Sequence, residues 1–249
     1  MSGHSKWKTI KHQKGVADAK RGAIFTKLSK AIIIAVKQGG GITDPVSNFR
    51  LRLAVESAKA SNMPKDTIDR AIEKGAGKGE GELIEVVYEG FAPHGINVIV
   101  EAATDNPTRT GQEVKNLFTK AGGSFGQPGS SSYLFKKMGE VFIKKSGKSF
   151  DEIFSLAVES GAEDIEETPE EAIIYTQTSD LSKVKDDLVS KGFEVTQAKF
   201  ILKPVTLISI SDQAQYDRVI DFLSSLEDLD DVQEVYSNLQ ITHSIHSWS

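Results

Sequence analysis

Residues 3–38 read GHSKWKTIKHQKGVADAKRGAIFTKLSKAIIIAVKQ. The first thirty residues hold eight Lys or Arg side chains and one acid, Asp18, a formal charge of +7 in a protein whose total is −5. A segment whose charge opposes that of the whole molecule indicates an anionic partner, and phosphate backbones are the commonest polyanion. Trp7, His4 and His12 add planar rings that can stack on bases. The alternative is a solvated, disordered tail, as many charge runs are.

From residue 18 to residue 38 the pattern becomes that of an amphipathic helix. Apolar side chains recur at intervals of three and four, at Ile24, Phe25, Leu28, Ile32, Ala35 and Val36. Four lysines lie beside this apolar stripe, within an arc of about 100° around the helix axis: Lys20, Lys27, Lys30 and Lys37. The sequence therefore predicts a helix that buries one face, presents a basic one and ends at the glycines 39–41.

Two more helices are predicted before residue 80. Asp44 as N-cap with Pro45 in the first turn begins one of them, whose buried face would include Val46. Pro64 begins the other, and Gly75 ends it. Residues 75–81, GAGKGEG, follow a helix and lack the Ser or Thr that a phosphate loop has after its Lys, so a flexible linker is favoured.

Beyond the linker the apolar period changes from 3.6 to 2. Strands at 84–91 and 96–102 are followed by a helix that glycines 122–123 end, and then by the order βαββαβ over residues 139–203, which is the ferredoxin-like plan. A capping box, Ser149 with Glu152, begins the first helix of that plan. Strands at 205–210 and 232–236 around a helix are too little to bury their own faces, so we expect them to pair with residues 82–135.

The predicted class is therefore α+β with three domains. A basic arm and helical bundle occupy residues 1–80, a discontinuous α+β domain occupies 82–135 and 205–240, and a ferredoxin-like domain, 139–203, is inserted into it. Residues 1–80 carry 16 basic and 7 acidic side chains, whereas residues 81–249 carry 14 and 28. Opposite charges on the two parts indicate different partners for them.

The sequence offers no constellation typical of an enzyme. There is no Cys, so thiolate chemistry is excluded and a reducing compartment is favoured. Of the five histidines only His243 and His246 have ligand-like spacing, and they lack further ligands. The acidic runs 163–171 and 227–231 have no apolar cover, so we interpret them as solvated surfaces. We expect a cytoplasmic protein that is not an enzyme, with no catalytic residue, cofactor, metal or membrane partner.

One polar segment, 105–110, has two interpretations. Asn106 can cap a helix whose first residue is Pro107, and capping alone accounts for much of the segment. Alternatively, Arg109 contacts an anion at that helix N-terminus.

The string GHSKWKTIKHQKGVADAKRGAIFTKL at 3–28 resembles the N-terminal signature of the YebC/PmpR family, which includes the mitochondrial translational activator of cytochrome c oxidase. The resemblance continues through GGGITDPVSNFRLRLAVESAKASNMPKDTIDRAIEKGAG at 39–77, YEGFAPHGINVIVEAATDNPTRTGQEVKNLFTKAGGSFG at 88–126 and DVQEVYSNL at 231–239. It implies the three-domain architecture and one of two functions. Some members are assigned as probable transcriptional regulators that bind DNA, and others are similar to translation factors that relieve ribosomes stalled on proline runs.

We therefore predict a nucleic-acid-binding regulator of gene expression that binds DNA through its basic N-terminal domain. A ribosome-associated translation factor, bound to ribosomal RNA and ribosomal proteins, is the alternative, and an acidic adaptor whose basic part docks on protein is a third class. The break at residues 62–64 suits a helix-turn-helix corner on DNA, whereas the arm suits irregular RNA. The predicted contacts are Lys6, Trp7, Lys8, Lys11, His12, Lys14, Lys20, Arg21, Lys27 and Lys30.

Overall fold

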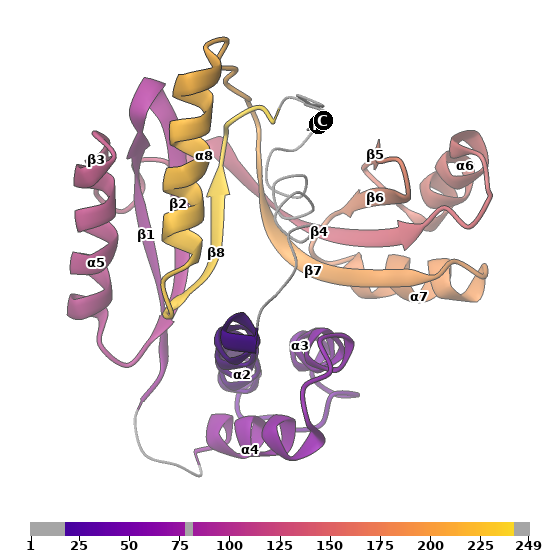
Figure 1. Cartoon of the computed structure of the whole chain (residues 1–249). Coiled ribbons are helices and arrows are strands. Elements are labelled where there is room, and N and C mark those ends of the chain that lie inside the picture. Colours follow the sequence, from indigo (N-terminus) through magenta and orange to yellow (C-terminus); the bar gives the residue numbers. More distant parts are fainter. Residues whose placement is uncertain (1–17, 78–81, 242–249) are drawn as a thin grey trace. The chain divides into compact units, whose positions relative to one another are not determined.

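The structure is a computed structural model that describes residues 18–77 and 82–241. Helices and two four-stranded sheets make up these residues, so the predicted α+β class is confirmed. The chain divides into a larger unit, residues 1–135 with 204–249, and a smaller unit, residues 136–203 (Figure 1). The larger unit is thus built from two stretches of chain that flank the smaller one in the sequence.

Three helices form the first part of the larger unit. They are α2 (Asp18–Gln38), α3 (Phe49–Ala60) and α4 (Lys65–Gly75). Their apolar faces share one cluster that includes the fully buried Ile32 and Leu51. The predicted ends of α2 and α4 are confirmed, since α2 stops before the glycines 39–41 and α4 stops at Gly75. Packing against α3 and α4 fixes the rotation of α2 about its axis, and with it the direction of its lysines.

The start of α3 differs from the prediction. Asp44 accepts a hydrogen bond from the Val46 amide at 3.0 Å, but this bond belongs to a turn. The helix begins at Phe49 because Asn48 caps it, accepting from the Leu51 amide at 3.1 Å. The prediction that Val46 lies on the buried face is wrong, since Val46 is 84% exposed.

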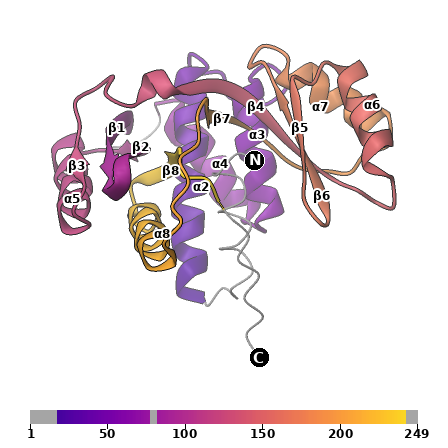
Figure 2. The ribbon, with the colours of Figure 1, turned by 90° about the horizontal axis from the view of Figure 1, so that it is seen from above.

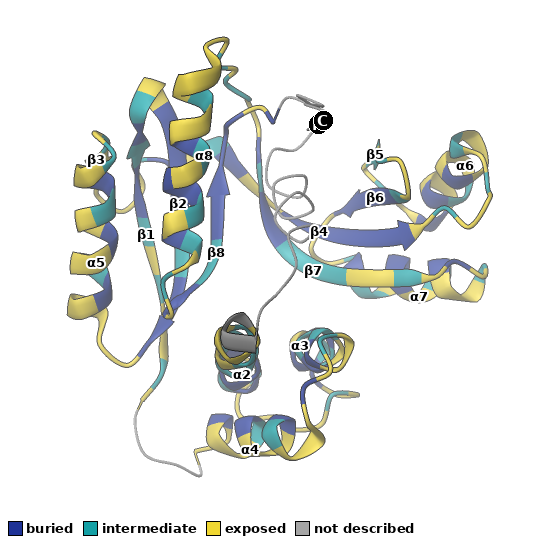
Figure 3. Ribbon diagram, in the orientation of Figure 1, coloured by how far each residue is buried: buried dark blue, intermediate teal, exposed yellow. Residues whose placement is uncertain are grey.

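The rest of the larger unit is a sheet of strand order β3-β1-β2-β8, with α5 and α8 on one of its faces (Figure 2). The elements are β1 (Ile84–Ala92), the 3₁₀ turn η1 (Pro93–Gly95), β2 (Ile96–Thr104), α5 (Pro107–Lys120), β3 (Ser124–Phe125), η2 (Ser132–Leu134), α8 (Gln213–Glu227) and β8 (Val232–Ser237). Strand β2 is buried along almost its whole length (Figure 3). Phe118 of α5 and Phe222 of α8 meet edge to face with ring centroids 5.0 Å apart. Because β8 pairs with β2, residues after 204 complete a sheet that begins before residue 135.

Two details of this sheet differ from the prediction. Ser124–Phe125 pairs with β1 as a short strand that the sequence pattern does not indicate. Residues 205–210, predicted as a strand, form only an isolated bridge between Ile208 and Leu239. Ile208 and Ile210 pack against the core of the sheet, so their alternation reflects burial without a strand ladder, and the prediction of a strand there is wrong.

Gly90 provides a test of the packing between β1 and α5. A Cβ atom at this position would lie 2.6 Å from the Phe118 ring and 2.6 Å from the Ser124 carbonyl oxygen. We expect Gly90→Ala to lower the free energy of unfolding by about 1–3 kcal/mol, because backbone and a buried ring must both shift. Gly22→Ala is the matched control, since that helical site is open and alanine favours helix by about 1 kcal/mol. Urea unfolding that ranks the two variants in the opposite order would contradict this packing.

The smaller unit has its own sheet, of strand order β5-β6-β4-β7. Its elements are β4 (Phe135–Lys144), α6 (Phe150–Ser160), β5 (Asp164–Glu167), β6 (Glu171–Thr176), α7 (Leu181–Ser190) and β7 (Val195–Pro204). The order βαββαβ with this strand arrangement is ferredoxin-like. The predicted capping box is present, with Ser149 and Glu152 bonded reciprocally, and α6 ends at Gly161 with φ of 102°.

No helix within residues 18–77 and 82–241 is long and apolar enough to cross a membrane. Nor do three His, Asp or Glu side chains of those residues lie where they could hold a metal ion together.

Candidate nucleic-acid interface and the Asp231 cluster

Most of the predicted nucleic-acid contacts precede the first described helix. Outside the described residues lie Lys6, Trp7, Lys8, Lys11, His12 and Lys14. Lys20 falls in α2 at a position whose side chain is not described, and Arg21 is exposed. The roles of these residues in binding nucleic acid stay predictions.

The other two predicted contacts, Lys27 and Lys30, bind groups of the protein itself. The Lys27 ammonium group donates to the carbonyl oxygen of Glu227, at the carboxyl end of α8. The Lys30 ammonium group donates to the Asp231 carboxylate at 2.5 Å and to the Asp230 carbonyl at 3.0 Å. Both lysines of α2 therefore contact the segment that joins α8 to β8.

Lys37 lies on the same side of α2 and has the same kind of partner. Its ammonium group donates to the Leu83 carbonyl at 3.0 Å, just before β1. We call Lys27, Lys30 and Lys37 the lysine face of α2. The spacing of these lysines along α2 agrees with the predicted arc of basic side chains. Their ammonium groups, however, donate to acceptor atoms elsewhere in the larger unit.

Asp231 connects this face to the sheet. Its side chain is 8% exposed, and its Oδ1 atom accepts from Lys30. Its Oδ2 atom accepts from the Thr110 hydroxyl at 2.6 Å, the Arg109 guanidinium at 2.8 Å and the Thr104 hydroxyl at 3.0 Å. These five residues form what we call the Asp231 cluster.

The topology of the sheet brings the cluster together. Thr104 ends β2 and Asp231 immediately precedes β8, and these antiparallel neighbours place the end of one strand beside the start of the other. The Ala103 amide donates to the Asp231 carbonyl at 2.8 Å, which fixes the backbone there. Helix α5 follows β2 after two residues and supplies Arg109 and Thr110 from its first turn.

The environment of Asp231 determines its charge. Burial by itself raises the pKa of this carboxyl group, but the hydrogen bonds from Lys30, Thr110, Arg109 and Thr104 outweigh burial and hold the pKa well below its ordinary value. The prediction that residues 227–231 form a solvated acidic surface is therefore wrong for Asp231. A buried carboxylate that stays ionised accepts hydrogen bonds and donates none, so it organises its neighbours.

The segment 105–110 has the capping geometry that the sequence predicts. Asn106 accepts from the Arg109 amide at 3.0 Å, and Pro107 is the first residue of α5. The Arg109 guanidinium binds carboxylates of the protein, Asp105 at 3.0 Å and Asp231 at 2.8 Å. The hydrogen bond and charge of Asp231 are the main reason that the pKa of Arg109 is raised. A contact from Arg109 to an external anion stays a prediction.

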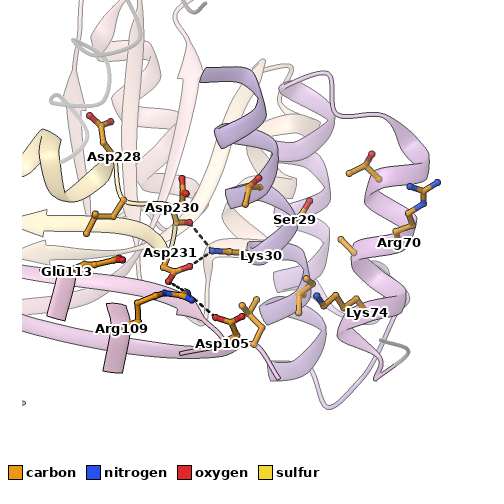
Figure 4. Close-up of a pocket in the computed structure, with 16 residues that line it drawn as sticks. Ser29, Lys30, Arg70, Lys74, Asp105, Arg109, Glu113, Asp228, Asp230 and Asp231 are labelled. Carbon is orange, nitrogen blue, oxygen red and sulfur yellow. Dashed lines mark hydrogen bonds and ion pairs between the residues drawn. The ribbon is translucent and has the colours of Figure 1, made fainter. Parts of the chain in front are cut away.

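A pocket of about 860 Å³ adjoins the cluster and is lined by α2, α4, α5 and residues 228–231. Its cationic lining residues are Lys30, Arg70, Lys74 and Arg109. Its acidic lining residues are Asp105, Glu113, Asp228, Asp230 and Asp231. Figure 4 shows Arg70 and Lys74 on α4, the acids on the other side, and Lys30 between them. With both charges on its walls, the pocket is not by itself an anion site.

Polar contacts join α2 to the sheet and to the segments beside it. The apolar cluster of α2, α3 and α4 and the apolar cluster of the sheet with α5 and α8 share no buried residue. Between them lie the contacts of the lysine face and a hydrogen bond from Gln38 to Glu85. Such contacts are weakened by salt and competing ions far more than a shared apolar core is.

Comparison with known proteins places the chain in a well-populated group. The family model described as the TACO1/YebC protein N-terminal domain matches residues 5–78, and that described as the TACO1/YebC second and third domain matches residues 83–239. A probable transcriptional regulatory protein of Trichlorobacter lovleyi is 47% identical over 97% of both chains. One of Aquifex aeolicus is 45% identical over 98% of both chains. The crystal structure of a conserved hypothetical protein from Aquifex aeolicus superposes with a TM-score of 0.85 at 44% identity, covering 92% of this chain and 94% of that one.

Proposed function

Because the chain belongs to the TACO1/YebC family, also known as YebC/PmpR, whose members compared above are named probable transcriptional regulatory proteins, we propose that it regulates gene expression by binding nucleic acid through its basic N-terminal residues. A role in transcription, which the names of these relatives state, favours DNA as the target of this chain. The proposal includes no catalytic step.

The uneven distribution of basic residues carries this proposal. Residues 1–43 hold nine basic side chains and one acid, whereas residues 44–77 hold six and five. On α4, the exposed Lys65, Arg70 and Lys74 alternate with the exposed Asp66 and Asp69, and acids repel a phosphate backbone. This pattern favours the arm and the start of α2 over α4 as the contact surface, and it weakens the helix-turn-helix interpretation.

Salt dependence tests the proposed contacts one by one. We expect each of the changes Lys6→Ala, Lys8→Ala, Lys11→Ala and Lys14→Ala to flatten the log–log salt slope of binding by about 0.7–0.9, because each lost phosphate contact releases fewer counterions. Trp7→Ala should lower affinity with an unchanged slope, since stacking contributes roughly 1–3 kcal/mol per base without releasing ions.

Lys65→Ala is the matched control for these lysines, because it removes an exposed cation of α4 outside the proposed surface. Fluorescence anisotropy at several salt concentrations measures all of the slopes. Equal slopes for the arm variants and the unchanged protein, or a flatter slope for Lys65→Ala alone, would count against the arm as the binding element.

A second candidate function, translation on the ribosome, is favoured by the opposite charges along the chain. Residues 136–203 hold 10 basic and 14 acidic side chains, in contrast to the basic arm. A ribosome presents RNA to the arm and basic proteins to the acidic unit, and two linked contacts reinforce each other through effective concentration. Duplex DNA offers only the first of these contacts.

A further inference from the structure

Two lysines of the lysine face, Lys27 and Lys30, already donate hydrogen bonds to carbonyl and carboxylate oxygens of the protein. A nucleic acid offers oxygen acceptors of the same kind. Lys27 binds a backbone carbonyl at the carboxyl end of α8, and Lys30 binds a carbonyl and a carboxylate. All three acceptors belong to residues 227–231, EDLDD, which we call the acceptor segment. It includes four acids and presents the negative end of the α8 dipole.

We infer that the acceptor segment is an internal competitor of nucleic acid: Asp231 occupies Lys30 in the free protein, and a phosphate group displaces it when nucleic acid binds. This inference rests on the proposed function and adds to it a regulation of the same basic surface. Lys27 and Lys30 extend the proposed contacts of the basic N-terminal residues only after they leave the acceptor segment.

Asp231 is a suitable stand-in for a phosphate. Like a phosphodiester, it presents anionic oxygens to an ammonium group, and its contact with Lys30 at 2.5 Å is a charge-assisted hydrogen bond. The Lys30 side chain is 16% exposed in this arrangement, so the free protein withholds most of its surface from an external anion.

The contact can also be released without leaving Asp231 as an isolated charge. When Lys30 departs, Asp231 keeps its hydrogen bonds from Arg109, Thr104 and Thr110. Loss of Lys30 alone therefore leaves the buried carboxylate with a cationic partner and two hydroxyl donors. The hydrogen bonds that Lys27 and Lys30 make to the acceptor segment are polar contacts, which salt and competing ions weaken.

The two adjacent acids of the acceptor segment supply the variant and its control. Asp231→Asn removes the carboxylate that holds Lys30, whereas Asp230→Asn removes one charge from an exposed side chain whose carbonyl, not its carboxylate, meets Lys30. Both variants change the net charge by the same amount. The probes are a labelled single-stranded RNA and a labelled DNA duplex of about 20 nucleotides or base pairs, longer than a typical single-domain site.

We expect Asp231→Asn to bind at least about fivefold more tightly than the unchanged protein, the lower end of typical coupling between sites. Its salt slope should steepen by about 0.7–0.9, since one more lysine meets a phosphate. Asp230→Asn should change affinity less than about twofold, and Lys30→Gln added to Asp231→Asn should remove the gain.

Equal effects of the two variants would overturn the inference and leave the proposed function standing. If neither the unchanged protein nor Asp231→Asn binds either probe, the proposed function fails as well. The two failures are therefore distinguishable in one set of titrations.

A measurement on the unchanged protein guards against a variant that does not fold. Carbodiimide-driven labelling of carboxylates with glycine ethyl ester, read by mass spectrometry, reports which acids are accessible. We expect Asp231 to be protected in the free protein and to gain label when the RNA or DNA probe is bound, while the exposed Asp230 is labelled in both states. Protection of Asp231 that persists with saturating probe would overturn the inference.

Discussion

Replacement of Asp231 by alanine is expected to lower the free energy of unfolding of the larger unit by about 3–5 kcal/mol, the range found when one partner of a buried ion pair is removed. The change leaves Arg109 and two buried threonine hydroxyls without their shared acceptor. It also removes the charge that holds Lys30 against the sheet. Unfolding in urea, followed by circular dichroism, measures the loss.

Asp230→Ala serves as the control, because an exposed side chain away from such contacts changes stability by no more than about 0.5 kcal/mol.

The contribution of Asp231 to stability also depends on pH. Since the folded pKa of Asp231 lies below its ordinary value of 3.8, its ionised form stabilises the fold fully above that value and loses this effect as pH falls through the folded pKa. The advantage of the unchanged protein over Asp231→Ala should therefore be constant above about pH 5 and shrink in stronger acid. A difference that grows in acid would contradict the assignment.

Deletion of residues 2–17 is expected to weaken nucleic-acid binding by roughly a hundredfold or more at about 0.1 M salt, because it removes four lysines, each worth nearly one power of ten there, together with Trp7. We expect the melting temperature to stay almost unchanged. The segment has few apolar residues, so its deletion removes little apolar surface that a core could bury.

A full-length variant with Lys6, Lys8, Lys11 and Lys14 all changed to Gln separates charge from length. It should lose most of the affinity that the deletion loses, and the further loss that only the deletion shows reports on Trp7 and the histidines. If the deleted protein unfolds at a much lower temperature, the arm is a packed element and its proposed role as a binding arm is wrong.

Local signals in the sequence predict most of the fold. Apolar spacing, the Ser149 capping box and the glycines that end helices depend on residues close together in the chain, and the structure has them where they are predicted. The errors occur where two local signals compete. Asp44 and Asn48 can each cap a helix, and only the hydrogen bonds from the Asn48 amide group to the Ala35 and Ile42 carbonyls select the second.

The candidate site is harder to predict because its residues are far apart in the sequence. Helical periodicity places Lys27, Lys30 and Lys37 on one side of α2, but it contains no information on what that side meets. Asp231 looks like any acid in an acidic run, and its burial depends on Thr104, 127 positions earlier. The available signal is the pairing of β2 with β8, since residues at adjoining ends of antiparallel neighbours lie together.

Isolation of the protein from its own cells after ultraviolet crosslinking, followed by sequencing of the attached nucleic acid, tests the central claim most directly. The full-length chain should carry DNA or RNA fragments that are enriched over background, and the chain without residues 2–17 should carry few. Enrichment of duplex DNA from defined loci would support transcriptional regulation, whereas enrichment of ribosomal RNA would support the ribosome. Recovery of the full-length chain with no nucleic acid above the level of the deleted chain would contradict the account.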